Sequence, residues 1–319
     1  MKTSRINRNL FCFGLYCLNF HAIAQSYSKH ELHPREWPAL KKGEKAVCHS
    51  AYCLLYSEEH EQAIWVAYEL TAEETLKSHE RSDKFLIDPK ISSGSATKED
   101  YTGSGFDRGH IAPAADMGWS ENTMQESFFM SNMSPQRPQC NRGIWKKGEE
   151  QVRDWAKNYG KLYVVAGPVL KKGLPTIGLN QVSVPELYYK VLLRPDSLHP
   201  EGIGMVIANE GSKMPLKTFA VSIDSVERLT GLDFFPWMSE SVEAKTEARL
   251  CLDCWSWGKG HYGEVKNPNT HRSGVHSNNE ILPKVSDSDE FRCHGITKKG
   301  NRCKRKVRVS GVNCFQHGG

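Results

Sequence analysis

Hydrophobic positions fall in short runs through the middle of the chain. Apolar and aromatic residues are closely spaced over 51–70, and residues 64–70 read Ile-Trp-Val-Ala-Tyr-Glu-Leu. Later apolar runs occupy 161–166, 188–193 and 204–208. Runs of this length that are rich in β-branched and aromatic residues are typical of strands. We therefore predict a strand at 64–70 and at each of the three later runs.

Helical spacing of apolar residues appears in two segments, 141–159 and 221–232. In the first, the apolar side chains fall near one face of a helix. The second ends at Gly231, and glycine often terminates helices. Strands and helices do not alternate as a regular βαβ repeat. We therefore predict an α+β fold, with a mixed or antiparallel sheet flanked by helices.

The N-terminal 24 residues have the pattern of a secretory signal. Three basic residues precede an apolar stretch at 10–20, and residues 22–24 read Ala-Ile-Ala, the small residues that a cleavage site requires. The alternatives are a short buried helix or a membrane anchor, for which the stretch is short. We predict a signal peptide over 1–24 and a secreted or periplasmic protein that has no stable membrane association after cleavage.

Composition divides the rest of the chain into four parts. Residues 25–46 are polar and form a lead-in, and 47–257 carry the strand and helix patterns. Residues 258–290 are rich in Asn, Ser, Gly, His and Lys, as flexible linkers are. Residues 291–319 form a short segment rich in Cys and His.

The net charge of +5 is unevenly distributed. Residues 1–24 carry +3 and residues 292–319 carry +8, which leaves −6 for the segment between them. This middle segment is therefore not a general binder of polyanions. Attraction to nucleic acid must come from local patches or from the basic C-terminal tail.

Eight cysteines remain if residues 1–24 are removed. An exported protein can form disulfides, although sequence alone does not fix their pairing. Cys48 with Cys53 and Cys251 with Cys254 are the plausible local pairs.

The segment Asp107-Arg108-Gly109-His110 places a permanent cation beside an imidazole. Phosphodiester hydrolysis needs one group that takes a proton from water and another that stabilises charge on the phosphate. A neutral His110 suits the first task and Arg108 suits the second. The same residues also fit a structural role, with an Asp107–Arg108 ion pair and a half-buried His110.

Asn141 and Glu149 are eight residues apart, about two turns of an α-helix. An amide oxygen and a carboxylate on one helix face suit Mg²⁺, which prefers oxygen ligands and keeps several of its waters. The alternatives are that Asn141 is a helix N-cap and that Glu149 lies on a solvated helix face.

Three segments together resemble the DNA/RNA non-specific endonucleases with a ββα-metal site. They are Asp107–His110, then 131–136 (Ser-Asn-Met-Ser-Pro-Gln), then 141–149 (Asn-Arg-Gly-Ile-Trp-Lys-Lys-Gly-Glu). Their order and spacing match, and the resemblance covers residues 47–257. It implies a ββα-metal nuclease core.

The resemblance also implies a role for six residues. His110 is the general base, Asn141 is the direct ligand of Mg²⁺ (or Mn²⁺), and Glu149 hydrogen-bonds metal-bound water. Asn132 helps to orient the base or the phosphate, and Arg108 lies near the phosphate. The family also uses an upstream arginine in the transition state, for which Arg81 is the best candidate.

The C-terminal segment 291–319 offers a Cys₃His ligand set. Its members are Cys293, Cys303, Cys314 and His317, and the last two have the spacing of a metal-binding pair. The segment resembles small Cys/His-rich modules with a Thr-Lys-Lys-Gly-x-x-Cys pattern. So short a unit needs a metal or disulfides to fold. We predict structural Zn²⁺, with disulfides as the alternative, and a nucleic-acid tether in its eight basic residues.

These features predict a secreted, Mg²⁺-dependent endonuclease that cuts DNA and RNA with low sequence specificity, since contacts to phosphates carry no base information. The alternative is a nucleic-acid-binding protein with a degenerate nuclease body and a basic zinc tail. The presence of His110, Asn141 and Glu149 together argues against degeneracy. The sequence leaves the oligomeric state open.

Overall fold

The structure is a computed structural model that describes residues 34–76, 78–195, 199–258, 291–292 and 306–307. The predicted signal peptide and all four predicted zinc ligands (Cys293, Cys303, Cys314 and His317) lie outside the described residues.

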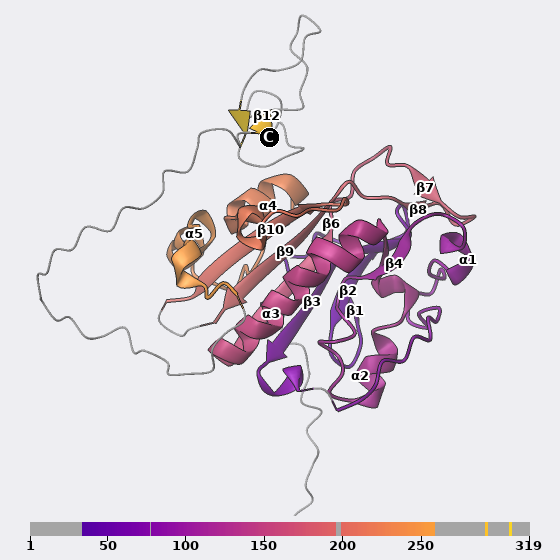
Figure 1. The fold of residues 1–319 in the computed structure, drawn as a ribbon, viewed down its shortest axis with the longest axis horizontal. Coiled ribbons are helices and arrows are strands. Elements are labelled where there is room, and N and C mark those ends of the chain that lie inside the picture. The colour runs from indigo at the N-terminus through magenta and orange to yellow at the C-terminus, as the bar shows by residue number, and fades with distance from the viewer. Residues whose placement is uncertain (1–33, 77, 196–198, 259–290, 293–305, 308–319) are drawn as a thin grey trace, which may run out of the picture. The chain divides into compact units, whose positions relative to one another are not determined.

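The centre of the fold is a seven-stranded sheet in the order β1-β2-β3-β6-β9-β10-β11, and every neighbouring pair is antiparallel (Figure 1). All four predicted strands are confirmed, as β3, β6, β9 and β10. The strands are β1 (Val47–Cys48), β2 (Cys53–Ser57), β3 (Gln62–Thr71), β6 (Lys161–Pro168), β9 (Leu187–Arg194), β10 (Glu201–Ala208) and β11 (Ala220–Val221).

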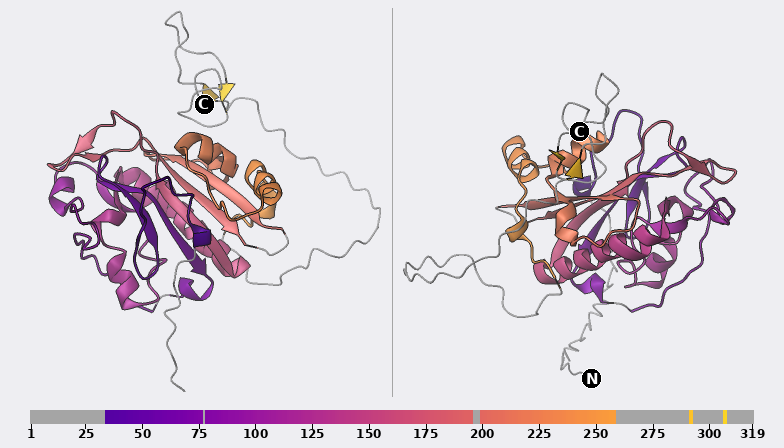
Figure 2. Two further views of the ribbon diagram at one scale, coloured as in Figure 1. Left: turned by 180° about the vertical axis from the view of Figure 1, so that it is seen from behind. Right: turned by 45° about the horizontal axis from the view of Figure 1, so that its top comes forward.

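Alternating side chains of the sheet enter two separate cores. Val66 and Tyr68 of β3 face the same core as helix α3 (Lys146–Tyr159). Trp65 and Ala67 face the opposite core, together with helix α4 (Ile223–Thr230). Helices therefore cover both faces of the sheet, with α5 (Glu240–Ala248) beside α4 (Figures 1 and 2). The α+β prediction is confirmed.

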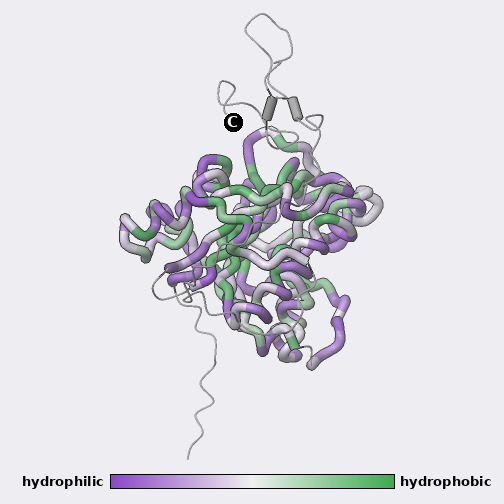
Figure 3. The backbone as a smooth tube through the Cα atoms, turned by 60° about the vertical axis from the view of Figure 1, so that its left-hand side comes forward, coloured by the Kyte–Doolittle hydropathy of each residue, from purple (hydrophilic) through white to green (hydrophobic). Residues whose placement is uncertain are grey.

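Hydrophobic residues are concentrated in the strands at the centre of the described body, and hydrophilic residues predominate at its edge (Figure 3). The largest fully buried side chains include Trp65, Trp145 and Trp155. Burial of a large apolar side chain contributes about 1.5–3 kcal/mol. Within the described part of the chain, no helix has the length and apolar character needed to cross a membrane.

The connection between β3 and β6 contains a smaller unit. Strand β4 (Asp107–His110) pairs antiparallel with β5 (Met133–Gln136), and His110 lies opposite Met133. A π-helical turn (Cys140–Trp145) follows and leads into α3. This order of strand, strand and helix is a ββα unit.

The connection also contains α1 (Lys98–Tyr101) and α2 (Glu121–Glu126). Two further short antiparallel pairs are β7 (Thr176–Ile177) with β8 (Val182–Ser183), and β12 (Phe291–Arg292) with β13 (Lys306–Val307).

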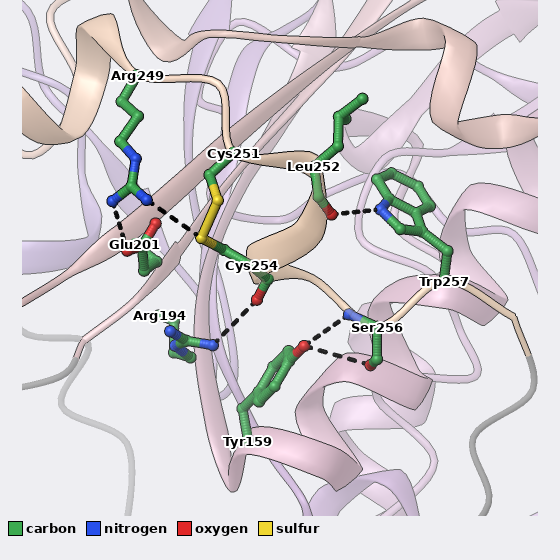
Figure 4. The surroundings of a disulfide bond; sticks show 9 residues. All are labelled: Tyr159, Arg194, Glu201, Arg249, Cys251, Leu252, Cys254, Ser256 and Trp257. Atoms are coloured by element: carbon green, nitrogen blue, oxygen red, sulfur yellow. Dashed lines mark hydrogen bonds and ion pairs between the residues drawn. A yellow bond between two sulfur atoms is a disulfide. The ribbon is translucent and has the colours of Figure 1, made fainter. Parts of the chain in front are cut away.

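Two disulfides close short loops, and both predicted local pairs are confirmed. Cys48–Cys53 links β1 to β2, and Cys251–Cys254 lies in the segment that follows α5 (Figure 4). Cys140 is a buried free thiol.

The segment 249–258, which contains the second disulfide, packs against α3. The Ser256 carbonyl accepts hydrogen bonds from Trp155 Nε1 (2.6 Å) and Gln151 Nε2 (3.1 Å), and the Tyr159 hydroxyl contacts Ser256 (Figure 4). Trp255 and Trp257 lie against the Trp155 ring, with centroids 4.7 and 4.9 Å away. The segment therefore continues the core that lies beneath α3.

Candidate active site

The β4–β5 ribbon is fixed to the central sheet by buried polar contacts. Ser134 of β5 donates to Gln62 Oε1 (2.5 Å) and shares a hydrogen bond with the Tyr188 hydroxyl (2.7 Å). Trp145 ties the ribbon to the helical side, because its Nε1 donates to the His110 carbonyl (3.2 Å). These contacts hold the ribbon, the sheet and the start of α3 as one frame.

His110 presents an imidazole nitrogen that has no protein partner. The residue is 7% exposed, and Nε2 makes no hydrogen bond. The Phe128 ring contacts the imidazole edge-on, with centroids 4.8 Å apart. Burial, and then the charge of Arg81, lower the pKa of His110 to about 3. The imidazole is therefore neutral at pH 7 and able to accept a proton. A purely structural histidine would have this nitrogen satisfied.

Gly109 lets the ribbon strands approach closely. A Cβ atom at this position would overlap the side-chain amide of Gln136, which is fully buried on β5. A larger residue beside His110 would therefore force the buried Gln136 side chain to move.

We expect Gly109→Ala to lower the free energy of unfolding by about 1–3 kcal/mol, because the added methyl group overpacks the ribbon. Urea unfolding followed by circular dichroism measures this change. Gly148→Ala is the matched control, since its Cβ would make ordinary contacts with Leu216 (3.8 Å) and Ile207 (3.9 Å). Alanine is the better helix former there, so the control should be as stable as wild type or more so. Equal stability of Gly109→Ala and wild type would contradict the steric argument.

Two arginines lie on the aromatic rings that flank His110. The Arg81 guanidinium is 4.9 Å from the centroid of Phe128, and that of Arg108 is 4.3 Å from the centroid of Phe85. Phe85 itself lies 6.0 Å from the His110 ring. The structure thus brings Arg81, Arg108 and His110 together around one aromatic surface.

Asp107 does not form the ion pair with Arg108 that the structural alternative requires. Its two carboxylate oxygens accept hydrogen bonds from Arg142 (2.6 and 2.8 Å), and Oδ2 also accepts one from Asn141 Nδ2 (2.9 Å). Arg142 and Asn141 together lower the pKa of Asp107 against the opposing effect of burial. Asp107 thereby joins β4 to the π-helical turn.

Asn141 lies inside the π-helical turn and is not an N-cap, a position that Gln139 occupies. The α-helix begins at Lys146 rather than at Asn141, and Gly143 has non-helical torsions (φ −112°, ψ −108°). The expectation of two regular α-helical turns between Asn141 and Glu149 is therefore wrong. The side-chain nitrogen of Asn141 donates a hydrogen bond to Asp107. The side-chain oxygen of Asn141 is therefore the atom left to bind a ligand.

Glu149 is half-buried in α3 and does not lie on a solvated helix face. Burial raises its pKa to about 7, and Asp116 adds to this effect, whereas the cations of Lys190, Arg153 and Arg81 oppose it. The Arg81 charge thus acts on both Glu149 and His110. Both groups therefore lie within the electrostatic reach of Arg81.

Three charged residues near Glu149 were missed by the sequence analysis. Asp116 accepts from Arg153 (2.7 Å) and from the Tyr68 hydroxyl (2.8 Å). Lys190 is 1% exposed, with its ammonium 4.0 Å from the Trp145 ring centroid. Arg153 could have been predicted from its position four residues after Glu149 on the same helix. Lys190 could have been predicted because it is the one charged residue within the apolar run 188–193. Asp116 carries no sequence signal.

Asn132 is fully buried, and its amide is engaged with the backbone that follows β4. Its Oδ1 accepts from the Ala112 amide (2.9 Å), and its Nδ2 donates to the carbonyls of Ala112 (2.9 Å) and Ser127 (2.8 Å). These bonds fix the chain two residues beyond His110. Asn132 is therefore placed to position the His110 strand.

A two-stranded ribbon that carries the histidine, and a helical segment that carries the asparagine and glutamate, define a nuclease of the ββα-metal class. The chain matches the DNA/RNA non-specific endonucleases over residues 39–241 and belongs to this family.

Similar proteins include mitochondrial nucleases and a bacterial one. The chain is 36% identical to nuclease EXOG of Xenopus laevis over 214 residues, which cover 61% of this chain and 59% of that protein. It is 34% identical to human endonuclease G (58% and 68% covered) and 33% identical to a nuclease of Nostoc sp. (62% and 76% covered). The chain thus spans less than two thirds of the length of the Xenopus relative.

Among solved structures, a crystal structure of the EndoG/EndoGI complex, which concerns EndoG inhibition, resembles this fold. Its TM-score is 0.59 at 32% sequence identity, and the match covers 65% of this chain and 90% of that chain.

The family implies a divalent metal such as Mg²⁺, and the residues present fit one. Asn141 offers an amide oxygen and Glu149 a carboxylate, both of which are donors that Mg²⁺ prefers. The amide nitrogen of Asn141 is held by Asp107, which fixes the direction of the oxygen.

Proposed function

We propose that the protein is a Mg²⁺-dependent (or Mn²⁺-dependent) endonuclease that hydrolyses phosphodiester bonds in DNA and RNA with low sequence specificity. The observation that carries this proposal is the unpartnered Nε2 of a neutral His110, flanked by the two phenylalanine rings on which Arg81 and Arg108 lie. Neutral imidazole is a general base, and a guanidinium stabilises phosphate charge.

In this proposal each residue has one task. His110 takes the proton from the attacking water, while Arg108 and Arg81 contact the phosphate and stabilise the charge that develops on it. Asn141 would hold the metal, and Glu149 would orient its waters. A bound Mg²⁺ supplies Lewis acidity at the phosphate and at the departing oxygen. Contacts made through phosphates favour substrates irrespective of sequence.

Incubation of the full chain with supercoiled plasmid and with RNA tests this function. We expect both to be cleaved in Mg²⁺ and neither in EDTA. Binding to both nucleic acids without cleavage in Mg²⁺ or Mn²⁺ would instead establish the alternative, a nucleic-acid-binding protein with a degenerate nuclease body.

We further propose that the protein is exported, as a secreted or periplasmic enzyme. Two disulfides in the described body support this, because such bonds persist in oxidising compartments. N-terminal sequencing of the protein recovered outside the cytoplasm of an expressing bacterium should start at Gln25. Retention of residues 1–24 on a cytoplasmic product would contradict export.

For the C-terminal module we propose one structural Zn²⁺ held by Cys293, Cys303, Cys314 and His317. Three thiolates and an imidazole form a donor set that suits tetrahedral zinc. Metal analysis of the full chain should find about one zinc per chain, which is lost in Cys303→Ser. Zinc-free protein with these cysteines oxidised would support the disulfide alternative.

A further inference from the structure

Three carboxylates gather between α4 and α5, away from the ββα unit. Asp224 and Glu227 lie one turn apart on α4, and Glu247 lies near the end of α5. One carboxylate oxygen of each residue lies within 4.8 Å of those of the other two. These helices cover the sheet face opposite to α3, so the cluster is separate from the Asn141 site (Figure 2).

Glu247 is the unusual member of this cluster, because it is 5% exposed and its Oε1 has no hydrogen-bond partner. Burial and the negative charges of Glu227 and Glu243 raise its pKa to about 8. An uncompensated buried carboxylate is strongly unfavourable. Buried carboxylates are normally paired, hydrogen-bonded or bound to a metal.

The described surroundings supply little positive charge. Arg228 is exposed and reaches Asp224 at 3.8 Å, and Arg249 is paired with Glu201 at 2.9 Å. Asp233 and Glu243 add further negative charge around Glu247. Glu227 Oε1 accepts a hydrogen bond from the backbone amide of Phe234 (2.9 Å), which fixes the orientation of the Glu227 carboxylate. The cluster therefore has an ordered, oxygen-only donor set with unbalanced negative charge.

We propose that Asp224, Glu227 and Glu247 form a calcium-binding site that joins α4 to α5. Oxygen-only ligands exclude the softer metals that select Cys or His. Calcium takes six to eight oxygens in flexible geometry, and half-exposed Asp224 and Glu227 leave room for waters to complete that number.

Calcium at this position would stabilise the packing of both helices on the edge of the sheet. Ile223 of α4 and Thr246 of α5 both lie against Gly202 of β10, where a Cβ would be 2.5 and 3.2 Å from their side chains. Repulsion between Glu247 and Glu227 acts to separate the same two helices. A bound cation removes that repulsion and stabilises the folded state by mass action.

Thermal unfolding of the full chain, freed of metal with EDTA and titrated with CaCl₂, tests the site. We expect the Tm of wild type to rise by about 4–8 °C at saturating calcium. Asn141→Ala should show the same rise, because Asn141 has no contact with α4 or α5 among the described hydrogen bonds, and its side chain bonds Asp107 instead. Glu240→Gln, an exposed acid on α5, is the matched control and should also keep the rise.

Glu247→Gln should lose the calcium-dependent rise. Without calcium it should unfold at the wild-type temperature or above, because a neutral amide replaces a buried acid whose charged form is disfavoured by burial and by Glu227. This result would show that the variant folds. Absence of a rise in wild type would overturn the proposal. So would a rise that Glu247→Gln retains, a rise that Asn141→Ala loses, or a larger rise with MgCl₂ than with CaCl₂ in the Asn141→Ala variant, which lacks the proposed Mg²⁺ ligand.

Discussion

Replacement of His110 by alanine is expected to reduce the rate of DNA and RNA cleavage by about 10²–10⁴-fold, the contribution typical of a general base. The Nε2 atom of the buried ring is unpartnered, so no other described side chain competes for the nitrogen that would accept the proton. Cleavage of plasmid and of RNA under single-turnover conditions measures the loss directly.

His60→Ala is the matched control for the loss of a buried histidine. His60 is 9% exposed and hydrogen-bonds Ser183 through Nδ1 (2.8 Å). Its replacement should lower stability and leave the cleavage rate of the folded fraction unchanged. Circular dichroism of His110→Ala should match that of wild type. A rate for His110→Ala close to that of wild type would place the base elsewhere.

Asn141→Ala is expected to raise the Mg²⁺ concentration needed for half-maximal cleavage by at least about 10–100-fold, the loss that follows removal of even indirect metal contacts. The reason is that Asn141 provides the proposed direct ligand. Magnesium titration of the cleavage rate measures the change. An unaltered magnesium requirement would exclude Asn141 as a ligand.

Glu149 should make this magnesium requirement depend on pH. With its pKa raised to about 7, Glu149 is a carboxylate above that pH and a neutral acid below it. A cation favours the carboxylate, so the apparent affinity for Mg²⁺ should fall by up to about tenfold per unit as the pH drops below 7. His110 adds nothing to this dependence, because its pKa is lowered to about 3 and it stays neutral throughout.

The Glu149→Gln variant tests whether the titration of Glu149 causes this pH dependence. The amide keeps the shape of the side chain but does not titrate. The apparent affinity of this variant for Mg²⁺ should therefore be lower than that of wild type and nearly independent of pH between 6 and 8. The same pH dependence in wild type and Glu149→Gln would assign the titration to another group.

The elements that sequence predicted best are those with a strong apolar pattern. Strands β3, β6, β9 and β10 are buried on both faces and read as continuous apolar runs. Helix α5 was missed because Glu240–Ala248 is almost wholly polar and is held by contacts with α4 and β10. The π-helical turn at Asn141 was missed because a one-residue change in helical phase leaves the apolar spacing nearly unaltered.

The same contrast holds for the candidate site. The fold does bring the 107–110 motif against Asn141, through the hydrogen bond between Asn141 and Asp107. Lys190 comes from a strand far from these motifs in sequence, whereas Asp116 lies in the loop that follows β4. Their relevance depends on tertiary contacts, namely the Trp145 ring above Lys190 and the Tyr68–Asp116–Arg153 hydrogen bonds.

The packing of segment 249–258 sets the minimum length of an independently folding fragment. The family match ends at residue 241, but the indole of Trp155 is covered by Trp255 and Trp257 and donates to the Ser256 carbonyl. A recombinant fragment that ends at 241 would lack these contacts. The Trp155 indole, and the face of α3 that segment 249–258 covers, would then be exposed to solvent. Expression boundaries for crystallisation or enzymology should therefore extend to Gly258, seventeen residues beyond the matched region.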